Sequence, residues 1–294
     1  MPAGELGGTW KRLGLIAGGG TLPLRIAEAE AAAGRAPYVI RIAEGEEGLA
    51  RFPHREASVA ELGGILKSLK AEECDAVCFA GQVHRPNFSR LRPDWRGAAL
   101  LPKVVAAARK GDGAIIDVIV GFFENEGFRV VGAEEAAGDL KGEAGSLTDM
   151  LPTDADWADI KKGADLVAAL GPCDVAQGVV VRRGFVLAVE AAEGTDAMLE
   201  RVAGLPEDLK GFEPGEEGAR VGVLVKTPKP DQELRVDLPT LGVRTVENAA
   251  KAGLVGIAVE AGRALIVDRD AVRAACEQNG VWVYSFTKDE VAAQ

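Results

Sequence analysis

The chain has the size and composition of a globular protein, with a strong excess of acid. It contains 294 residues, of which 47% are hydrophobic and 27% charged, and its formal net charge is −11. These values predict a folded protein of roughly two domains with a sizeable core. The acidity argues against nucleic acid as a partner, because duplex binding needs a basic face to neutralise phosphates.

The cysteines and the apolar runs favour a soluble, cytoplasmic protein. The four cysteines form no CxxC pair and have no neighbouring histidine, so we expect reduced thiols that pack as small hydrophobes. The longest apolar run, around Ala114–Phe123, is too short to span a bilayer. Met1–Trp10 lacks the charged and apolar regions of a signal peptide. Contact with the inner face of a membrane stays open as an alternative to a freely soluble state.

Strands and helices alternate along the first half of the chain. Buried strands are expected at 13–17, 38–42, 76–80 and 128–132. Capping signals or helical spacing predict helices at 21–33, 59–72, 101–109 and 114–125. This alternation implies βαβ units and a parallel sheet, and we place the first domain at 11–140.

The second half has a different character. Residues 141–152 are polar, small and without a sustained period, which predicts a linker before a second α/β domain at 153–294. Helices are expected at 157–170, 195–203, 246–252 and 269–279. Strands are expected at 221–225 and 281–286, with hairpins formed by 177–182 with 185–190 and by 256–259 with 264–267.

The glycine run Gly18–Gly20 follows the first strand and precedes the first helix. Backbone N–H groups of Gly19 and Gly20, at the positive end of a helix dipole, suit a phosphate. The run does not fit GxGxxG, and no acid ends the second strand in the place of a ribose-binding residue, so binding of NAD(P) is disfavoured but stays open. The alternative is a tight turn that needs small residues for packing.

Polar residues follow two other predicted strands. Gln82 and Arg85 come after the strand at 76–80, and the carboxyl ends of parallel strands are where open α/β sheets bind ligands. Glu190 ends the first hairpin, and Thr195 with Asp196 opens the next helix, so these three side chains can face a common cleft. The alternative for Thr195 and Asp196 is a simple helix N-cap.

Residues 226–245 gather cations and prolines within an acidic chain. The segment holds four cations, three carboxylates and three prolines: Lys226, Lys229, Arg235, Arg244; Asp231, Glu233, Asp237; Pro228, Pro230, Pro239. Proline fixes φ and removes a backbone donor, so a stiff loop is expected here rather than a helix. The cations suit an oxyanion and the acids suit Mg²⁺, which together predict a site for a phosphorylated ligand. A solvated, charge-balanced surface loop is the alternative.

Several of these pieces, taken in order, resemble the LpxI-type UDP-2,3-diacylglucosamine pyrophosphatases of lipid A biosynthesis. The resemblance covers roughly positions 11–286. The matching runs are Gly14–Gly20 with Leu22-Pro23, Gly81–Val83 through Pro86, Glu190–Asp196, Lys229-Pro230 with Gln232, Arg235–Pro239 with Gly242, and Val259–Gly262. The Lys-Pro…Arg-Val-Asp-Leu-Pro and Glu-Gly-Thr-Asp runs are the specific ones.

The resemblance implies a fold and a reaction. It implies a Rossmann-like N-terminal parallel-sheet domain, a C-terminal mixed α/β domain and a ligand chamber between them. It further implies Mg²⁺-dependent hydrolysis of UDP-2,3-diacylglucosamine to UMP and 2,3-diacylglucosamine 1-phosphate, with water attacking the phosphorus on the sugar side. A chamber between domains would hide two acyl chains from water, since large exposed apolar patches promote association.

The resemblance also assigns roles within the 226–245 segment. Asp237 matches the family's acid in Arg-x-Asp-x-Pro and is the expected metal ligand or water-activating group, with Glu190 as a second candidate metal ligand. Lys226, Lys229 and Arg235 are the expected phosphate donors, and Gln232 is an expected substrate contact. Glu233 stands where family members often have Asp, which weakens it as a ligand.

Two other functions stay open from the sequence. One is an NAD(P)-dependent oxidoreductase that uses the glycine turn, and the other is a non-catalytic carrier of a lipid or nucleotide that uses the same cleft. A homodimer formed by pairing of apolar hairpins is also compatible with the chain.

Overall fold

The protein divides into two compact units, and each is described by itself. The computed structural model describes residues 9–42, 45–83, 90–210, 219–230 and 232–294. The first unit runs to Asp139 and includes Glu233–Val236, whereas the second comprises Leu140–Gln232 and Asp237–Gln294. The segment around Asp237 therefore leaves the second unit, joins the first for four residues and returns.

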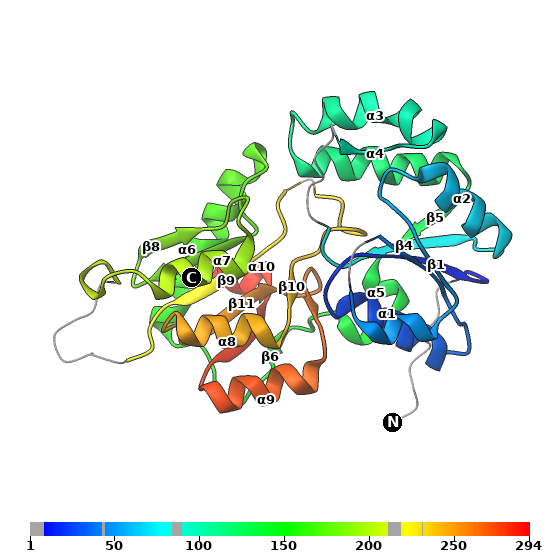
Figure 1. The fold of residues 1–294 in the computed structure, drawn as a ribbon. Coiled ribbons are helices and arrows are strands. Elements are labelled where there is room, and N and C mark those ends of the chain that lie inside the picture. Colours follow the sequence, from blue (N-terminus) through cyan, green and yellow to red (C-terminus); the bar gives the residue numbers. More distant parts are fainter. Residues whose placement is uncertain (1–8, 43–44, 84–89, 211–218, 231) are drawn as a thin grey trace. The chain divides into compact units, whose positions relative to one another are not determined.

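A five-stranded, fully parallel sheet forms the centre of the first unit (Figure 1). Its strand order is β3-β2-β1-β4-β5. The strands are β1 (Leu13–Ala17), β2 (Tyr38–Arg41), β3 (His54–Glu56), β4 (Ala76–Ala80) and β5 (Arg129–Val131). The central strand β1 is buried at every residue, as its unbroken apolar run predicts for a strand covered on both faces. The predicted parallel sheet is confirmed.

Five helices belong to the first unit. They are α1 (Leu22–Ala32), α2 (Leu62–Ala71), α3 (Trp95–Ala107), α4 (Asp112–Asn125) and α5 (Ala133–Ala136). The apolar side chains of α2 at 62, 65, 66 and 69 are all buried, which confirms the face predicted from helical spacing. Helix α3 begins six residues before its predicted start, because Asp94 caps it by accepting a hydrogen bond from the backbone N–H of Gly97 at 2.9 Å.

A six-stranded mixed sheet forms the centre of the second unit. Its order is β6-β13-β11-β9-β7-β8. The strands are β6 (Gly145–Ser146), β7 (Gly178–Arg182), β8 (Phe185–Val189), β9 (Val223–Lys226), β11 (Gly256–Glu260) and β13 (Trp282–Phe286). Strands β9, β11 and β13 are mutually parallel, whereas β6, β7 and β8 add to the two sides in antiparallel pairs. The strand β6 lies within the predicted linker 141–152.

One of the two predicted hairpins is confirmed and the other is wrong. Strands β7 and β8 pair across Arg183-Gly184, where φ is +47° and +78°, as a turn with two left-handed residues requires. The strand β11 does not pair with β12 (Leu265–Ile266), which instead lies parallel to β10 (Thr240–Leu241). All five residues of β11 are buried, so the strand fits a central position between β9 and β13 rather than a hairpin with one exposed face.

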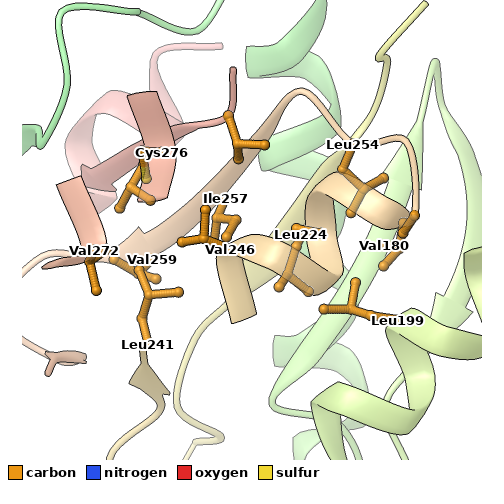
Figure 2. Packing of buried hydrophobic residues seen from close by; sticks show 14 of the residues in the cluster. Val180, Leu199, Leu224, Leu241, Val246, Leu254, Ile257, Val259, Val272 and Cys276 are labelled. Carbon is orange, nitrogen blue, oxygen red and sulfur yellow. The ribbon is translucent and has the colours of Figure 1, made fainter. Parts of the chain in front are cut away.

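Helices cover the second sheet and complete its core. They are α6 (Asp154–Leu170), α7 (Gly194–Ala203), α8 (Val243–Lys251), α9 (Arg269–Asn279) and α10 (Lys288–Ala292). Figure 2 shows Leu224 and Ile257 from the sheet packed with Leu199, Val246 and Cys276 from the helices. In the part of the chain that the structure describes, none of the helices has the length and hydropathy to cross a bilayer. Short 3-10 turns lie at Glu47–Arg51, Gly138–Leu140, Gly171–Cys173 and Glu207–Lys210.

The C-terminal residues of α4 are tied to two other helices by one carboxylate. Glu126 accepts a hydrogen bond from Lys70 of α2 at 2.9 Å and pairs with Arg96 of α3. The hydrogen bond from Lys70 and the pairing with Arg96 hold the pKa of Glu126 below its usual value. The ion pair therefore links α2, α3 and α4 at one point.

We expect Glu126→Gln to destabilise the protein by about 1 kcal/mol at pH 7, measured by urea unfolding. A depressed folded-state pKa stabilises the fold above the unfolded pKa, and this contribution is lost as pH falls through the folded value. The difference from wild type should therefore shrink below about pH 4.5. Glu247→Gln, at an exposed acid of α8, is the control. An equal effect of the two substitutions would contradict the assignment.

Candidate active site

A buried lysine lies where three strands of the second sheet meet. Lys226 is the last residue of β9, a strand buried at every position, and its side chain is only 5% exposed. Gly178 of β7 and Val259 of β11 are its register partners on the two sides. The ends of these strands therefore place the ammonium group at one edge of the sheet, where open α/β sheets commonly bind ligands.

The ammonium group of Lys226 is held by a short chain of hydrogen bonds. Its Nζ donates to Thr195 Oγ1 at 2.8 Å and to the carbonyl of Thr240 at 3.3 Å. Thr195 in turn donates to Glu190 Oε1 at 3.0 Å. The hydroxyl of Thr195 thus joins a carboxylate to an ammonium group, which is more than a helix cap would require. The second oxygen of Glu190, Oε2, is buried and has no hydrogen-bond partner among the described residues.

The negative charges of three carboxylates act on the Lys226 ammonium group. Burial lowers the pKa of Lys226, because the charged form loses water, and the negative charges of Glu190, Asp196 and Asp237 oppose that shift. Glu190, Thr195 and Lys226 thus form a hydrogen-bonded cluster at the end of β9, and the charge of Asp196 reaches the same ammonium group. A common cleft for Glu190, Thr195 and Asp196 stays a prediction. The cluster can balance a cation among acids and present both to a ligand.

Asp237 is positioned by two glutamines. Gln177 Nε2 donates to Asp237 Oδ2 at 3.0 Å, and Gln232 Nε2 donates to the backbone carbonyl of Asp237. The other end of the Gln232 amide accepts a hydrogen bond from the backbone N–H of Lys229 at 2.8 Å. Gln232 therefore closes the loop between Lys229 and Asp237, and Gln177 orients the carboxylate.

The predicted phosphate donor Lys229 already has an anionic partner. Its Nζ pairs with Asp174, whose φ of +54° lies in the left-handed region. The side chain of Lys229 is 13% exposed. A phosphate bound by Lys229 would have to compete with Asp174 for the ammonium group.

Arg235 is anchored within the first unit. Its guanidinium pairs with Glu233 at 2.6 Å and with Glu124 of α4 at 2.7 Å, and Val236 packs against the core of the first unit. The ion pair with Arg235 also lowers the pKa of Glu233. The four-residue insertion into the first unit thus ends one residue before Asp237.

Asp196 belongs to a second polar contact on the helices. Its carboxylate lies 3.1 Å from Arg244 Nε and accepts a hydrogen bond from Asn248 Nδ2 at 3.1 Å. Both partners lie on α8, so Asp196 links the start of α7 to α8. The Asp196 carboxylate is therefore already bound by Arg244 and Asn248 rather than free to contact a substrate.

In the first unit, the glycine turn meets the end of β4. Gly19 and Gln82 exchange backbone hydrogen bonds of 2.8 and 2.9 Å, which brings together two residues that the sequence predicts as ligand contacts. The Gly19 N–H is consequently occupied, whereas Gly20, at φ +86°, is exposed beside the start of α1. The close approach of the two segments also explains why position 81 is glycine, because a Cβ atom there would lie 2.5 Å from the Gly19 carbonyl oxygen. Arg85 lies outside the described residues.

Four partners of these side chains were not predicted from the sequence. They are Gln177, Asp174, Asn248 and Glu124. Gln177 precedes β7, and only the antiparallel pairing of β7 with β9 brings it beside the loop after Lys226. The other three lie 52 to 111 positions from the residues that they contact. No local pattern in the sequence marks such pairs.

We expect Arg235→Ala to release the loop before Asp237 from the first unit. The substitution removes both ion pairs, so amide hydrogen exchange across 232–238 should accelerate by at least about tenfold, as local opening becomes easier. Arg263→Ala, which removes an ion pair with Glu260 in the second unit, is the control. Unchanged exchange in the Arg235 variant would show that the ion pairs do not hold this segment.

Comparison with known proteins identifies the family. A sequence model of the LpxI N-terminal domain matches residues 12–140, and one of the LpxI C-terminal domain matches residues 143–284. The chain is 50% identical over 281 residues to the UDP-2,3-diacylglucosamine pyrophosphatase LpxI of Caulobacter vibrioides, with 95% of this chain and 99% of the relative covered. Both halves of the chain are thus matched in order, and the chain belongs to the LpxI family.

Proposed function

We propose that this protein hydrolyses the pyrophosphate bond of UDP-2,3-diacylglucosamine, releasing UMP and 2,3-diacylglucosamine 1-phosphate in lipid A biosynthesis. The observation that carries this proposal is the 50% identity, over nearly the full length of both chains, to a relative named for that pyrophosphatase activity. The cluster around Lys226 supports it, because a diphosphate needs cations to offset its charge and an acid to activate water.

Asp237 is the residue that we propose to activate the attacking water. The residue is half-buried, and one carboxylate oxygen accepts a hydrogen bond from Gln177. The other oxygen is the one that we propose to meet the water molecule. A positioned carboxylate can accept the proton of a water molecule as it attacks phosphorus on the sugar side. The hydrogen bond from Gln177 orients Asp237 without neutralising it, since an amide donates no full charge.

Lys226 is the cation that we propose to offset charge on the reacting phosphates. Its hydrogen bonds to Thr195 and to the Thr240 carbonyl use two of the three N–H bonds of the ammonium group. In a site removed from water, such a charge acts more strongly than it would in solvent. Lys229 is proposed as a second phosphate donor, through exchange of Asp174 for phosphate.

For Arg235 the ion pairs favour positioning over direct phosphate contact. Its carboxylate partners Glu233 and Glu124 both lie in the first unit, so the guanidinium already has anionic partners there. Gln232 fits a similar role, because both ends of its amide are bound to the loop backbone. Their contact with substrate stays a prediction.

The residues present fit Mg²⁺ as a cofactor that is shared with substrate. Within the described residues, no three His, Cys, Asp or Glu side chains lie close enough to cage a metal ion. Mg²⁺ does not require such a cage, because it usually binds through one or two carboxylates, several waters and substrate phosphate. When bound, it would neutralise phosphate charge. Asp237 is the more accessible ligand, whereas the free oxygen of Glu190 is buried against Gly178.

The first unit is proposed as a Rossmann-like domain that takes part in substrate binding. The strand order β3-β2-β1-β4-β5 supports this, since doubly wound nucleotide-binding sheets use the order 3-2-1-4-5-6. The exposed Gly20 amide and the Gln82 side chain are the candidate contacts in this unit. The lipid chamber that the resemblance implies and a homodimer both stay predictions.

Asp237→Ala should abolish most turnover while leaving the fold and product binding intact. Loss of a general base typically costs about 10²–10⁴-fold, so we expect kcat to fall by at least about 100-fold. The measurement is release of UMP from detergent-dispersed UDP-2,3-diacylglucosamine. Asp270→Ala, in the first turn of α9, is the matched control. Turnover of the Asp237 variant at the wild-type rate would remove this residue from the mechanism.

Chelation with EDTA should stop UMP release, and added Mg²⁺ should restore it. A direct test uses Mn²⁺ as a paramagnetic substitute, with the free ion followed by electron paramagnetic resonance in the presence of product. Asp237→Asn should weaken Mn²⁺ binding by about tenfold or more, because it removes a charged oxygen ligand. If binding were unchanged in this variant, Asp237 would not be a metal ligand.

The same assay separates the other two functions that the sequence leaves open. Metal-dependent release of UMP would eliminate a non-catalytic carrier, and an NAD(P)-dependent oxidoreductase would instead consume a nicotinamide cofactor. For an acylated substrate, the reaction is proposed to take place in the cytoplasm at the inner membrane face.

A further inference from the structure

The outer face of α3 has an unusual composition for an exposed helix surface. Its exposed residues include Trp95, Ala98, Ala99, Pro102 and Ala106. Trp95 is 73% exposed, the largest value among the exposed large hydrophobic side chains of the described residues. Exposed helix faces are normally polar or charged, with the apolar stripe turned inward. The apolar outer face of α3 therefore needs an explanation other than folding.

Cations surround this apolar face, and acids are almost absent from it. Residues 90–110 contain six Lys and Arg side chains but a single acid, Asp94, in a chain whose net charge is −11. The exposed members are Arg90, Arg92, Lys103, Arg109 and Lys110. The Asp94 carboxylate is engaged, since it accepts hydrogen bonds from the backbone N–H groups of Gly97 and Gly64, both at 2.9 Å.

The helix is fixed to the first unit, so this face is presented on a rigid base. Helix α3 packs against α2 and α4 and lies outermost of the three in Figure 1. Arg96 ties it to Glu126, and the same guanidinium lies over the Trp95 ring at 4.9 Å. Tryptophan with adjacent Arg or Lys is typical of helices that lie in a membrane interface, where the ring is half in the apolar layer and the cations meet headgroups.

We propose that the outer face of α3, with its flanking cations, is the surface through which this protein docks on an anionic phospholipid bilayer. The small side chains at 98, 99, 102 and 106 allow close approach to the lipid, and Trp95 enters the interface. The exposed cations face anionic headgroups, each contributing attraction that decays within a Debye length. The acids Asp112, Asp117 and Glu124 lie on the neighbouring helix α4.

This inference deepens the proposed function, because an acylated substrate resides in a membrane, and it identifies the face of the chain that would meet that membrane. The distribution of charge on this face favours lipid over nucleic acid as the ligand. A nucleic-acid surface would be cationic throughout, whereas the centre of this face is apolar and the cations lie around it.

The test is co-sedimentation of the full chain with vesicles of phosphatidylethanolamine and phosphatidylglycerol, compared with neutral phosphatidylcholine vesicles. We expect binding to the anionic vesicles that weakens at high salt. The double variant Lys103→Glu/Arg109→Glu should reduce partitioning by at least about tenfold. Lys251→Glu/Arg273→Glu, at exposed cations of α8 and α9, is the matched control and should bind within about twofold of wild type.

Tryptophan fluorescence locates the contact independently. Of the four tryptophans, Trp10 and Trp282 are buried, at 6% and 2% exposure, and Trp157 is half-buried against Tyr284. Trp95 is the most exposed, so a blue shift on adding anionic vesicles should disappear in Trp95→Phe and persist in Trp157→Phe. Absence of wild-type binding, equal binding to neutral vesicles, or equal loss in the two double variants would overturn the proposal. Release of UMP from detergent-dispersed substrate by the α3 variant is measured separately, so failure of the docking surface and failure of the proposed reaction are distinguishable.

Discussion

The arrangement of the second unit depends on one buried ammonium group. Lys226 ends a strand that is otherwise apolar, and its charge is removed from water among Glu190, Asp196 and Asp237. Removing a cation from such a group leaves uncompensated carboxylates, and removing the acids leaves an unpaired ammonium group; either change is strongly unfavourable. The Thr195 hydroxyl accepts a hydrogen bond from Lys226 and donates one to Glu190, so it links the two charged groups. Hydrogen bonds from residues on several elements offset the unfavourable free energy of burying the Lys226 charge. The same hydrogen bonds fix the position of the ammonium group.

A second constraint acts on the loop that follows. The chain is bound to the second unit through Gln232, enters the first unit at Glu233–Val236 and returns at Asp237. Asp237 therefore follows directly after a segment held by another unit, while Gln177, the residue before β7, orients its carboxylate. Pro228 and Pro230 precede this stretch and Pro239 follows it, so the prolines limit the conformations of the chain on both sides of the fixed points. A loop that is fixed at both ends needs no helix beneath it to hold the Asp237 carboxylate in place.

The contrast between local and distant information explains what the sequence could predict. Short local patterns of apolar residues predict the strand Leu13–Ala17 and the buried face of α2. The parallel sheet and its helices could therefore be predicted from the sequence. The pairing of β11 was not, because its apolar run fits a central strand as well as a hairpin until β13 is placed beside it. Likewise, Asp237 could be selected from its motif, but its dependence on Gln177 follows from the β7–β9 register. Contacts between residues so far apart in the sequence cannot be predicted from the residue pattern of a single helix or strand.

The distribution of cations gives the two proposals a common physical basis. A chain with net charge −11 repels both a diphosphate and an anionic membrane at long range, yet neither needs to be attracted by the whole surface. At physiological ionic strength, charges more than about 8 Å apart are largely screened, so local composition decides what each surface binds. The 226–245 segment concentrates cations near half-buried acids, which suits a phosphate with a metal ion. Residues 90–110 instead place cations around an apolar helix face, which suits an interface between headgroups and acyl chains. The two regions differ in apolar content, and this difference decides which kind of ligand each one suits.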